Sequence, residues 1–146
     1  MAASRNPVVV GWKEQVDFPD WAMRRVKVKI DTGARTSALD VISYELRSVP
    51  GQGMIAELRL ALNRQRPDRV KIVEVPVLGM VVVSNSSGMR EQRPLIETTI
   101  RLGNVTKRIR LTVTNRHSMR FPVILGRKAL EGDFLVDVSR KYLLRK

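Results

Sequence analysis

Apolar and polar residues alternate along several stretches of this chain. Arg25–Ile30 alternates basic and apolar residues, Ile55–Leu62 places leucine at every second position towards its end, and Arg108–Thr114 shows the clearest alternation of all. A period of two residues is typical of strands that bury one face. The pattern therefore predicts strands at these three positions.

The remaining strands are predicted from residue type and from the turns that bound them. Asp40–Val49 is rich in β-branched and aromatic residues, and the run Val75–Val83 has the length of a buried strand rather than of a membrane span. Glycine, proline, asparagine and serine mark the connections. We predict strands at Val8–Phe18 (ending at Pro19), Val70–Val83, Leu95–Leu102, Leu135–Val136 and Tyr142–Leu144, and turns or loops at 50–53, 63–68, 84–88 and 103–104.

Only one helix is predicted, a short one at Arg127–Glu131 that Gly132 ends. A chain of 146 residues is the size of one domain, and it contains no repeat or linker. We therefore expect residues 1–146 to form a single all-β domain, a barrel or folded-over sheet with one short C-terminal helix.

The candidate chemistry lies at the end of one predicted strand. Asp31, Thr32 and Gly33 directly follow Arg25–Ile30, and far downstream Val123–Leu125 closes on Gly126. A carboxylate, a small hydroxyl residue and a glycine can form a tight loop that presents the carboxylate to a cleft, with the threonine supplying a hydrogen bond. The order and separation of the two motifs make a chance turn at Asp31 the weaker interpretation.

Composition argues against several other classes of site. The chain has no cysteine and a single histidine, His117, so a disulfide framework or a zinc site built from these residues is not expected. There is no phosphate-binding glycine loop of the Walker type, and we predict no metal and no cofactor. Because no apolar run approaches the roughly 20 residues of a membrane helix, we expect a cytoplasmic protein without a membrane partner.

The charge changes the expected partner. The formal net charge is +13, and residues 101–146 hold 12 of the 27 basic residues but only 3 of the 14 acidic ones. Such a field attracts acidic partners, whether nucleic acid, a membrane surface or an acidic peptide. The aromatic content is only 5%, so a platform that stacks single-stranded RNA bases is poorly supplied, and nucleic acid is not a required partner.

The motifs resemble those of a bacterial group of retropepsin-like aspartic peptidases once called ATP-dependent zinc proteases. The resemblance spans nearly the whole chain, in the blocks Gly11–Glu14, Lys29–Leu39, Arg93, Asn115–Pro122, Ile124–Leu130 and Phe134–Asp137. It implies an acid-protease-like barrel, a homodimer, and processing of oligoglutamate tails that a RimK-type ligase adds to a small-subunit ribosomal protein.

The same resemblance implies roles for individual residues. Asp31 would be the catalytic carboxylate, Thr32 and Gly33 would shape its loop, and Gly126 would allow close backbone packing beneath it. Unlike simple retropepsins, this chain carries basic residues in the matching blocks. We predict that they bind the carboxylates of the substrate: Lys29, Arg35, Arg116 and Arg127.

Two alternatives stay open at this stage. Arg35 and Arg127 could instead form structural ion pairs with Asp40 and Glu131. Peptide hydrolysis by carboxylates needs two acids that share a proton, and this chain has one Asp-Thr-Gly. The second acid would be Asp31 of a second copy, or a local group such as Asp137 or Glu14.

Three functions are therefore compared. The leading hypothesis is an aspartic endopeptidase acting on glutamate-rich tails. The second is a non-catalytic basic β-barrel that binds ribosomal RNA or protein, and the third is a catalytically silent adaptor with the peptidase fold.

Overall fold

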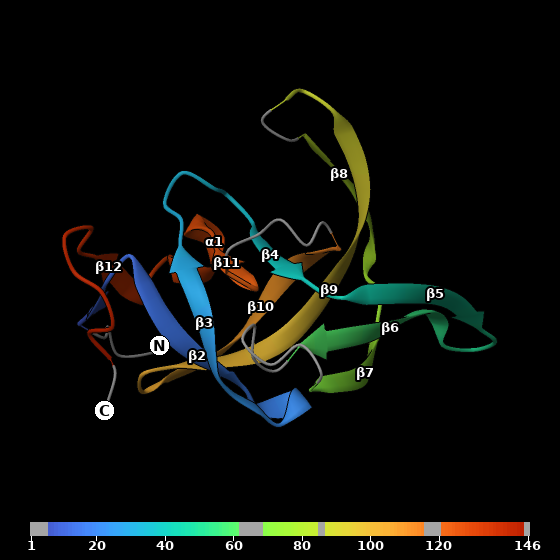
Figure 1. Cartoon of the computed structure of the whole chain (residues 1–146), viewed down its shortest axis with the longest axis horizontal. Helices are drawn as coiled ribbons and strands as arrows, with labels where there is room; N and C mark the ends of the chain where they lie inside the picture. The colour runs from blue at the N-terminus through green and yellow to red at the C-terminus, as the bar shows by residue number, and fades with distance from the viewer. Residues whose placement is uncertain (1–5, 62–68, 85–86, 116–120, 145–146) are drawn as a thin grey trace, which may run out of the picture.

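The computed structural model describes residues 6–61, 69–84, 87–115 and 121–144, and these residues are mainly β-strand (Figure 1). The only helices in these ranges are one turn of 3-10 helix, η1, and one short α-helix, α1. In chain order the elements are β1 Val8–Val10, β2 Lys13–Phe18, η1 Pro19–Trp21, β3 Met23–Ile30, β4 Ser37–Asp40, β5 Ser43–Val49, β6 Gly53–Ala61, β7 Val70–Pro76, β8 Gly79–Ser84, β9 Arg90–Leu102, β10 Val105–Thr114, β11 Val123–Leu125, α1 Arg127–Leu130 and β12 Phe134–Val136.

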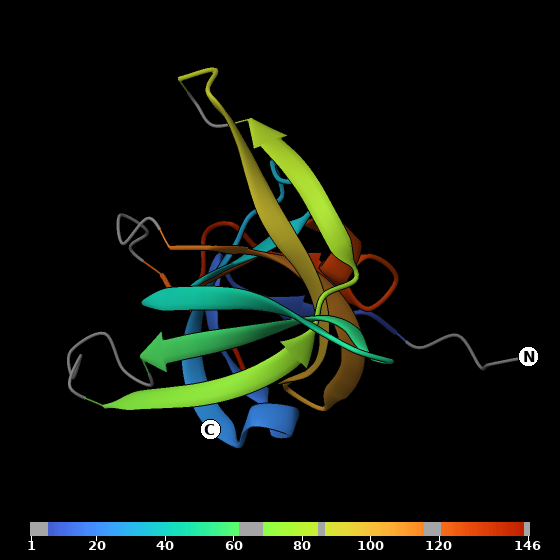
Figure 2. The same cartoon turned by 90° about the vertical axis from the view of Figure 1, so that its right-hand side faces the viewer.

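Six strands close into a barrel. The largest sheet has the order β10-β4-β11-β3-β2-β9-β8, and β10 also pairs with β9, so the sheet returns on itself and leaves β8 outside the ring. β5, β6 and β7 form a separate three-stranded sheet beside the barrel, and the hairpin of β8 and β9 projects from the body (Figures 1 and 2). The predicted all-β barrel with one short helix is confirmed.

Alternating side chains fill the barrel. Val16 and Phe18 of β2, Val28 of β3 and Ile96 and Ile100 of β9 are almost completely buried. The residues directly before and after each of them in the sequence are more exposed, as expected for strands with one face inward. Burial of these apolar side chains is the main stabilising contribution to the barrel, and it fixes the register of the strands that carry the candidate site.

The predicted strand Val70–Val83 is two strands rather than one. β7 ends at Pro76, and the chain then crosses from the three-stranded sheet to the barrel sheet, where β8 begins at Gly79. Proline has no N–H for a ladder, and the amide of Leu78 already donates to Leu95 O of β9 at 2.8 Å. The expected burial was also wrong, because β8 is an edge strand and Val82 is 58% exposed.

Two other predicted strands are divided. Val8–Phe18 consists of β1, which pairs in parallel with β12, and β2, which pairs antiparallel with β3. Asp40 belongs to β4 rather than to the strand Asp40–Val49, and β5 begins only at Ser43. β4 itself was not predicted, because four residues are too short a segment to show a clear period.

The end of the described chain is not a strand. Tyr142–Leu144 was predicted to close the chain as a strand, but it forms a turn, and Tyr142 has a left-handed φ of 52°. β12 pairs with β1 of the same chain. The predicted strands at Arg25–Ile30, Leu95–Leu102 and Arg108–Thr114 are confirmed with earlier starts, and the helix is confirmed at Arg127–Leu130. Leu62 and the predicted loop 63–68 lie outside the described residues.

Candidate active site

Asp31 stands where three strands meet. It is the first residue after β3, and β11 runs parallel to β3 with Leu125 opposite Ile30. The amide of Asp31 donates to Leu125 O at 2.9 Å, and β11 also pairs with β4 on its other side. The two sequence motifs, almost a hundred residues apart, are therefore in direct contact.

The loop after Asp31 turns back on the carboxylate. Asp31 Oδ1 accepts the amide of Gly33 at 3.0 Å, and Asp31 O accepts the amide of Ala34 at 3.2 Å. Asp31 is half-buried, whereas Thr32 and Gly33 are exposed. Thr32 contributes its carbonyl oxygen, which accepts Arg127 Nη1 at 3.0 Å. The hydrogen bond expected from its hydroxyl has no partner among the described residues.

Gly126 lets the downstream motif pack against this loop. A Cβ at this position would lie 2.5 Å from Thr36 O and 2.8 Å from Ala34 O, so only glycine fits without movement of the backbone. The amide of Gly126 donates to Ser37 Oγ at 3.0 Å, and the next amide, of Arg127, donates to Ala34 O at 2.8 Å. The predicted role of Gly126 in close packing agrees with this geometry.

Ser37 was missed by the sequence analysis as a supporting residue. It is 2% exposed, at the start of β4, and its hydroxyl accepts the amide that Gly126 presents. The available signal was its place seven residues after the aspartate's strand, within the block of residues around Asp31. A serine in that block has no distinguishing mark until β11 is seen beside β4.

The predicted basic residues are only partly brought together. Arg35 and Arg127 line one pocket of about 570 Å³ together with Thr32, and both are exposed. Lys29 is exposed on β3, two residues before Asp31. Arg127 donates to Thr32 O, and within the described residues no ion pair joins it to Glu131. Arg116, like His117, lies outside the described residues.

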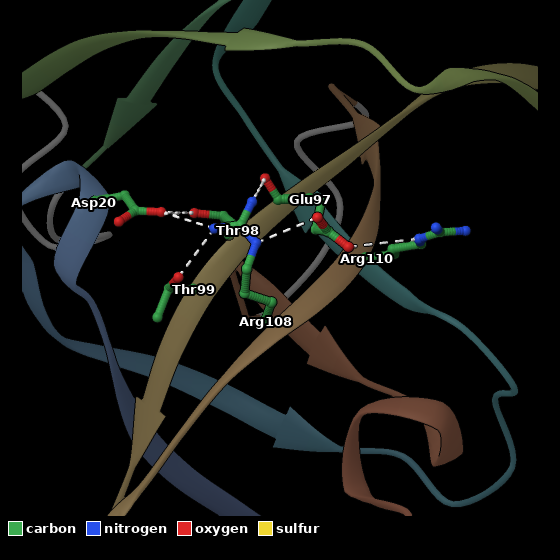
Figure 3. Close-up of polar contacts among 6 residues, drawn as sticks. All are labelled: Asp20, Glu97, Thr98, Thr99, Arg108 and Arg110. Carbon is green, nitrogen blue, oxygen red and sulfur yellow. Dashed lines mark hydrogen bonds and ion pairs between the residues drawn. The ribbon is translucent and has the colours of Figure 1, made fainter.

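A second pocket, of about 530 Å³, lies between the Asp31 loop region and β8, where Arg35 and Thr36 face Val81–Val83. Its lining also includes a network of charged side chains on β9 and β10 that was not predicted (Figure 3). Arg108 binds Asp20 at 3.3 Å and Glu97 at 3.2 Å, and Glu97 is also 3.7 Å from Arg110. Because Arg108 is paired within the chain, Arg35 offers the less neutralised positive charge in this pocket.

The two local carboxylates considered as a second acid have other partners. Glu14 is 1% exposed and accepts three backbone amides, from Gly11 at 2.7 Å, Leu143 at 2.9 Å and Leu144 at 3.2 Å. Glu14 is therefore a buried structural side chain that binds the backbone, which does not favour it as the second acid. Its side chain ties the end of the chain to the start of β2.

Asp137 caps the turn after β12. Its Oδ1 accepts the hydroxyl of Ser139 at 2.6 Å and the amide of Ser139 at 3.0 Å. The side-chain bond, followed by the backbone bond, holds the pKa of Asp137 below its usual value. Asp137 is therefore a capping acid at the end of β12, and its Oδ1 is engaged by Ser139.

Among the described residues, no group of three or more histidine, cysteine, aspartate or glutamate side chains could hold a metal ion. Within those ranges, no helix is long and apolar enough to cross a membrane.

The closed barrel and the Asp-Thr-Gly loop held by a downstream strand and glycine define the retropepsin-like class of proteins. A family model described as the retropepsin-like aspartic endopeptidase RimB matches residues 9–146. The chain belongs to this RimB-like family.

Several curated relatives are named as ligases. Proteins called probable alpha-L-glutamate ligase from Shewanella pealeana and Parasynechococcus marenigrum are 30% and 34% identical to this chain. The matches cover 97% and 94% of this chain but 31% and 29% of the relatives, and a protein of the same name from Desulfotalea psychrophila is 29% identical over 28% of its length. The chain spans about a third of the length of the curated relatives it matches.

A solved structure shares the fold. A protein of unknown function from Legionella pneumophila superimposes with a TM-score of 0.78, covering 96% of this chain and all of that one, at 20% identity. At this level of identity the likeness supports the fold alone.

Proposed function

We propose that this chain is an aspartic endopeptidase that cuts glutamate-rich acidic tails, with Asp31 as its catalytic carboxylate. The observation that carries the proposal is the loop after β3, where Asp31 is half-buried, bonded to Gly33 and fastened to Leu125. Such a loop keeps one carboxylate rigid and accessible, as proton transfer to and from a substrate requires.

Two copies of the chain would complete the catalytic pair. In the proposed reaction, one Asp31 takes a proton from water as the oxygen adds to the scissile carbonyl carbon. Asp31 of the second copy protonates the carbonyl oxygen, and the carbon–nitrogen bond then breaks with a proton passing to the leaving amine. The engagement of Glu14 and Asp137 elsewhere favours this homodimer over a local second acid.

The charge around the loop supports an acidic substrate. Arg35 and Arg127 line the pocket beside Thr32, and Lys29 precedes the loop on β3. Guanidinium groups bind carboxylates through paired hydrogen bonds, and a lysine adds a positive charge without that geometry. Together with Arg116, which lies outside the described residues, they would hold the glutamate side chains on either side of the cut bond.

The names of the relatives support a link with glutamate ligation. Part of each relative named as a ligase is similar to this protein. A ligase that builds oligoglutamate and a peptidase that shortens it would act on the same acidic chain. We propose that the substrate is a small-subunit ribosomal protein whose tail a RimK-type ligase has extended, and that both enzymes act in the cytoplasm.

Mass spectrometry of a glutamate-extended ribosomal-tail peptide tests this function. Wild-type protein should shorten the peptide near neutral pH, with or without a chelator, whereas Asp31→Asn should not. Asp137→Asn is the matched control, since it removes an equal charge from the competing acid and should retain activity. Activity that survives Asp31→Asn, or that a chelator abolishes, would contradict the proposal.

Mixing subunits tests the pairing. If Asp31 must come from both copies, an equal mixture of wild type and Asp31→Asn, allowed to exchange, should keep about a quarter of the activity of the same total amount of wild type. Retention of about three quarters would mean that one aspartate per dimer is enough, and retention of about half would mean that each subunit acts independently.

The net charge of +13 also favours the non-catalytic basic barrel. Phosphate-dominated binding weakens steeply with salt and does not need Asp31. Tight, salt-sensitive RNA binding without any peptide shortening would favour that function over the peptidase.

A further inference from the structure

β3 carries a row of basic side chains on its exposed face. Arg25, Lys27 and Lys29 are exposed and separated by single buried residues. Alternate residues of a strand share a face and stand about 6.6 Å apart along it. This basic row of β3 therefore starts roughly 20 Å from Asp31 and leads towards it.

The far end of the row is built by a β-bulge. Val16 pairs with Val26 and Phe18 with Met23, so that Arg24 and Arg25 together lie opposite Asp17. The bulge breaks the alternation and leaves both arginines exposed.

The backbone at the bulge is strained. Arg25 has a φ of 55°, a left-handed conformation that is unfavourable for a residue with a Cβ, and its amide is held by Asp17 Oδ1 at 2.9 Å. The side chain of Arg25 is exposed and does not belong to the buried core. Strain of this kind is commonly kept where it positions a functional group.

A third arginine completes the pocket at this end. Arg101 of β9 lies opposite Asp17 in the β2–β9 pairing. With Arg24 and Arg25 it lines a pocket of about 540 Å³, which we call the arginine pocket. Asp17 is the one acidic residue in its lining, so the side chains around it carry an excess of two positive charges.

These cations form no ion pair with the carboxylates that the structure describes. Among the ion pairs formed within residues 6–61, 69–84, 87–115 and 121–144, none involves Arg24, Arg25 or Arg101, and none involves Lys27 or Lys29. Arg108, an exposed arginine that lines another pocket, is by contrast held by Asp20 and Glu97 (Figure 3). The arginine pocket and the basic row are thus available to an outside anion.

We propose that the arginine pocket and the basic row of β3 form a second binding site, which holds the distal carboxylates of an extended acidic peptide. Same-face side chains of an extended peptide repeat at the spacing of the row, and arginine forks bind carboxylates in pairs. The inference rests on the proposed function, because it treats Asp31 at the near end of the row as the place of cleavage. The site would select tails long enough to reach roughly 20 Å beyond the cut.

Binding of oligoglutamate of two lengths to the full chain tests the site. The protein carries Asp31→Asn to prevent cleavage, and the labelled peptides have about three glutamates and about nine, the longer spanning roughly 30 Å when extended. Fluorescence anisotropy should show that Arg24→Gln, Arg25→Gln and Arg101→Gln together weaken the long peptide about tenfold and leave the short one unchanged.

A matched triple variant separates the site from the overall charge. Arg59→Gln, Arg69→Gln and Arg90→Gln remove the same charge from exposed arginines elsewhere and should change the affinity of the long peptide less than twofold, roughly the effect of distant screened charges. Equal losses in both triple variants, or no loss in the first, would overturn the proposal.

Two further readouts separate this proposal from others. The first readout is competition by a single-stranded RNA of similar length. If the RNA displaces the long peptide and binds the first triple variant more weakly than wild type, the site belongs to nucleic acid and the proposal is overturned. With Asp31 intact, the first triple variant should raise KM for the long peptide without changing kcat. If wild type cuts no peptide, the proposed function fails, whereas the anisotropy result decides the binding site independently.

Discussion

Replacing Glu14 by glutamine changes one oxygen of the buried carboxylate to an amide nitrogen and leaves the shape intact. The carboxylate now accepts two amides on Oε2, from Gly11 and Leu143, and a third on Oε1, from Leu144. Glutamine can keep its single oxygen on the pair of shorter bonds. Its NH₂ group would then face the amide of Leu144, donor against donor.

The expected cost follows from these three bonds. A hydrogen bond to a charged group contributes about 1.5–3 kcal/mol, and a neutral bond roughly half as much. One such bond is lost and two become neutral, and non-additivity within one cluster reduces the total. We expect Glu14→Gln to lower the free energy of unfolding by about 3 kcal/mol.

Urea denaturation at neutral pH measures this value. With an m-value of about 2 kcal/mol/M, the midpoint should fall by about 1.5 M. Glu45→Gln, on the exposed face of β5, is the matched control and should stay within about 0.5 kcal/mol of wild type. A loss below about 1 kcal/mol for Glu14→Gln would refute the assignment of Glu14 as the residue that ties the chain end to β2.

Three further changes have defined outcomes. Gly126→Ala places a Cβ 2.5 Å from Thr36 O, so we expect a loss of at least about 3 kcal/mol in urea denaturation, and a loss within error of zero would contradict the close approach. Arg25→Gly relieves a φ of 55° and should raise stability by about 1 kcal/mol, seen as a higher Tm, while weakening the long glutamate peptide; a lower Tm would argue against the strain. Ser139→Ala should move the pKa of Asp137 up towards 3.8 in an NMR titration. Because folding lowers the pKa of Asp137, its interaction with Ser139 stabilises the fold above the unfolded pKa, and that stabilisation is lost as the pH falls through the folded pKa. An unchanged pKa of Asp137 in Ser139→Ala would show that Ser139 Oγ does not cause the lowered pKa.

The predicted parts of the site are those whose residues are contiguous in the sequence. Asp31, Thr32 and Gly33 could be placed after a strand because the alternation of Arg25–Ile30 is local. The pairing with Gly126 was predicted from a second short motif, and the contact of Asp31 with Leu125 agrees with it.

The parts that were missed depend on long-range pairing. Glu14 looks like surface in a strand of alternating residues, and its partners Leu143 and Leu144 lie 129 and 130 positions away. The break between β7 and β8 is similar. The run from Val75 to Val83 contains no charged side chain, and only the arrangement of two separate sheets shows that its second half lies exposed at an edge.

The position of β11 between β3 and β4 also determines when the candidate site can form during synthesis of the chain. The amide of Asp31 can bond to Leu125 O only after 94 further residues have been added, and Gly126 must follow before its amide can bond to Ser37 in the loop region. Contacts of such separation form late in folding and demand that most of the chain be present. A chain still emerging from the ribosome would therefore carry Asp31 without its supporting strand until β11 has been made, and the candidate site could not assemble before then.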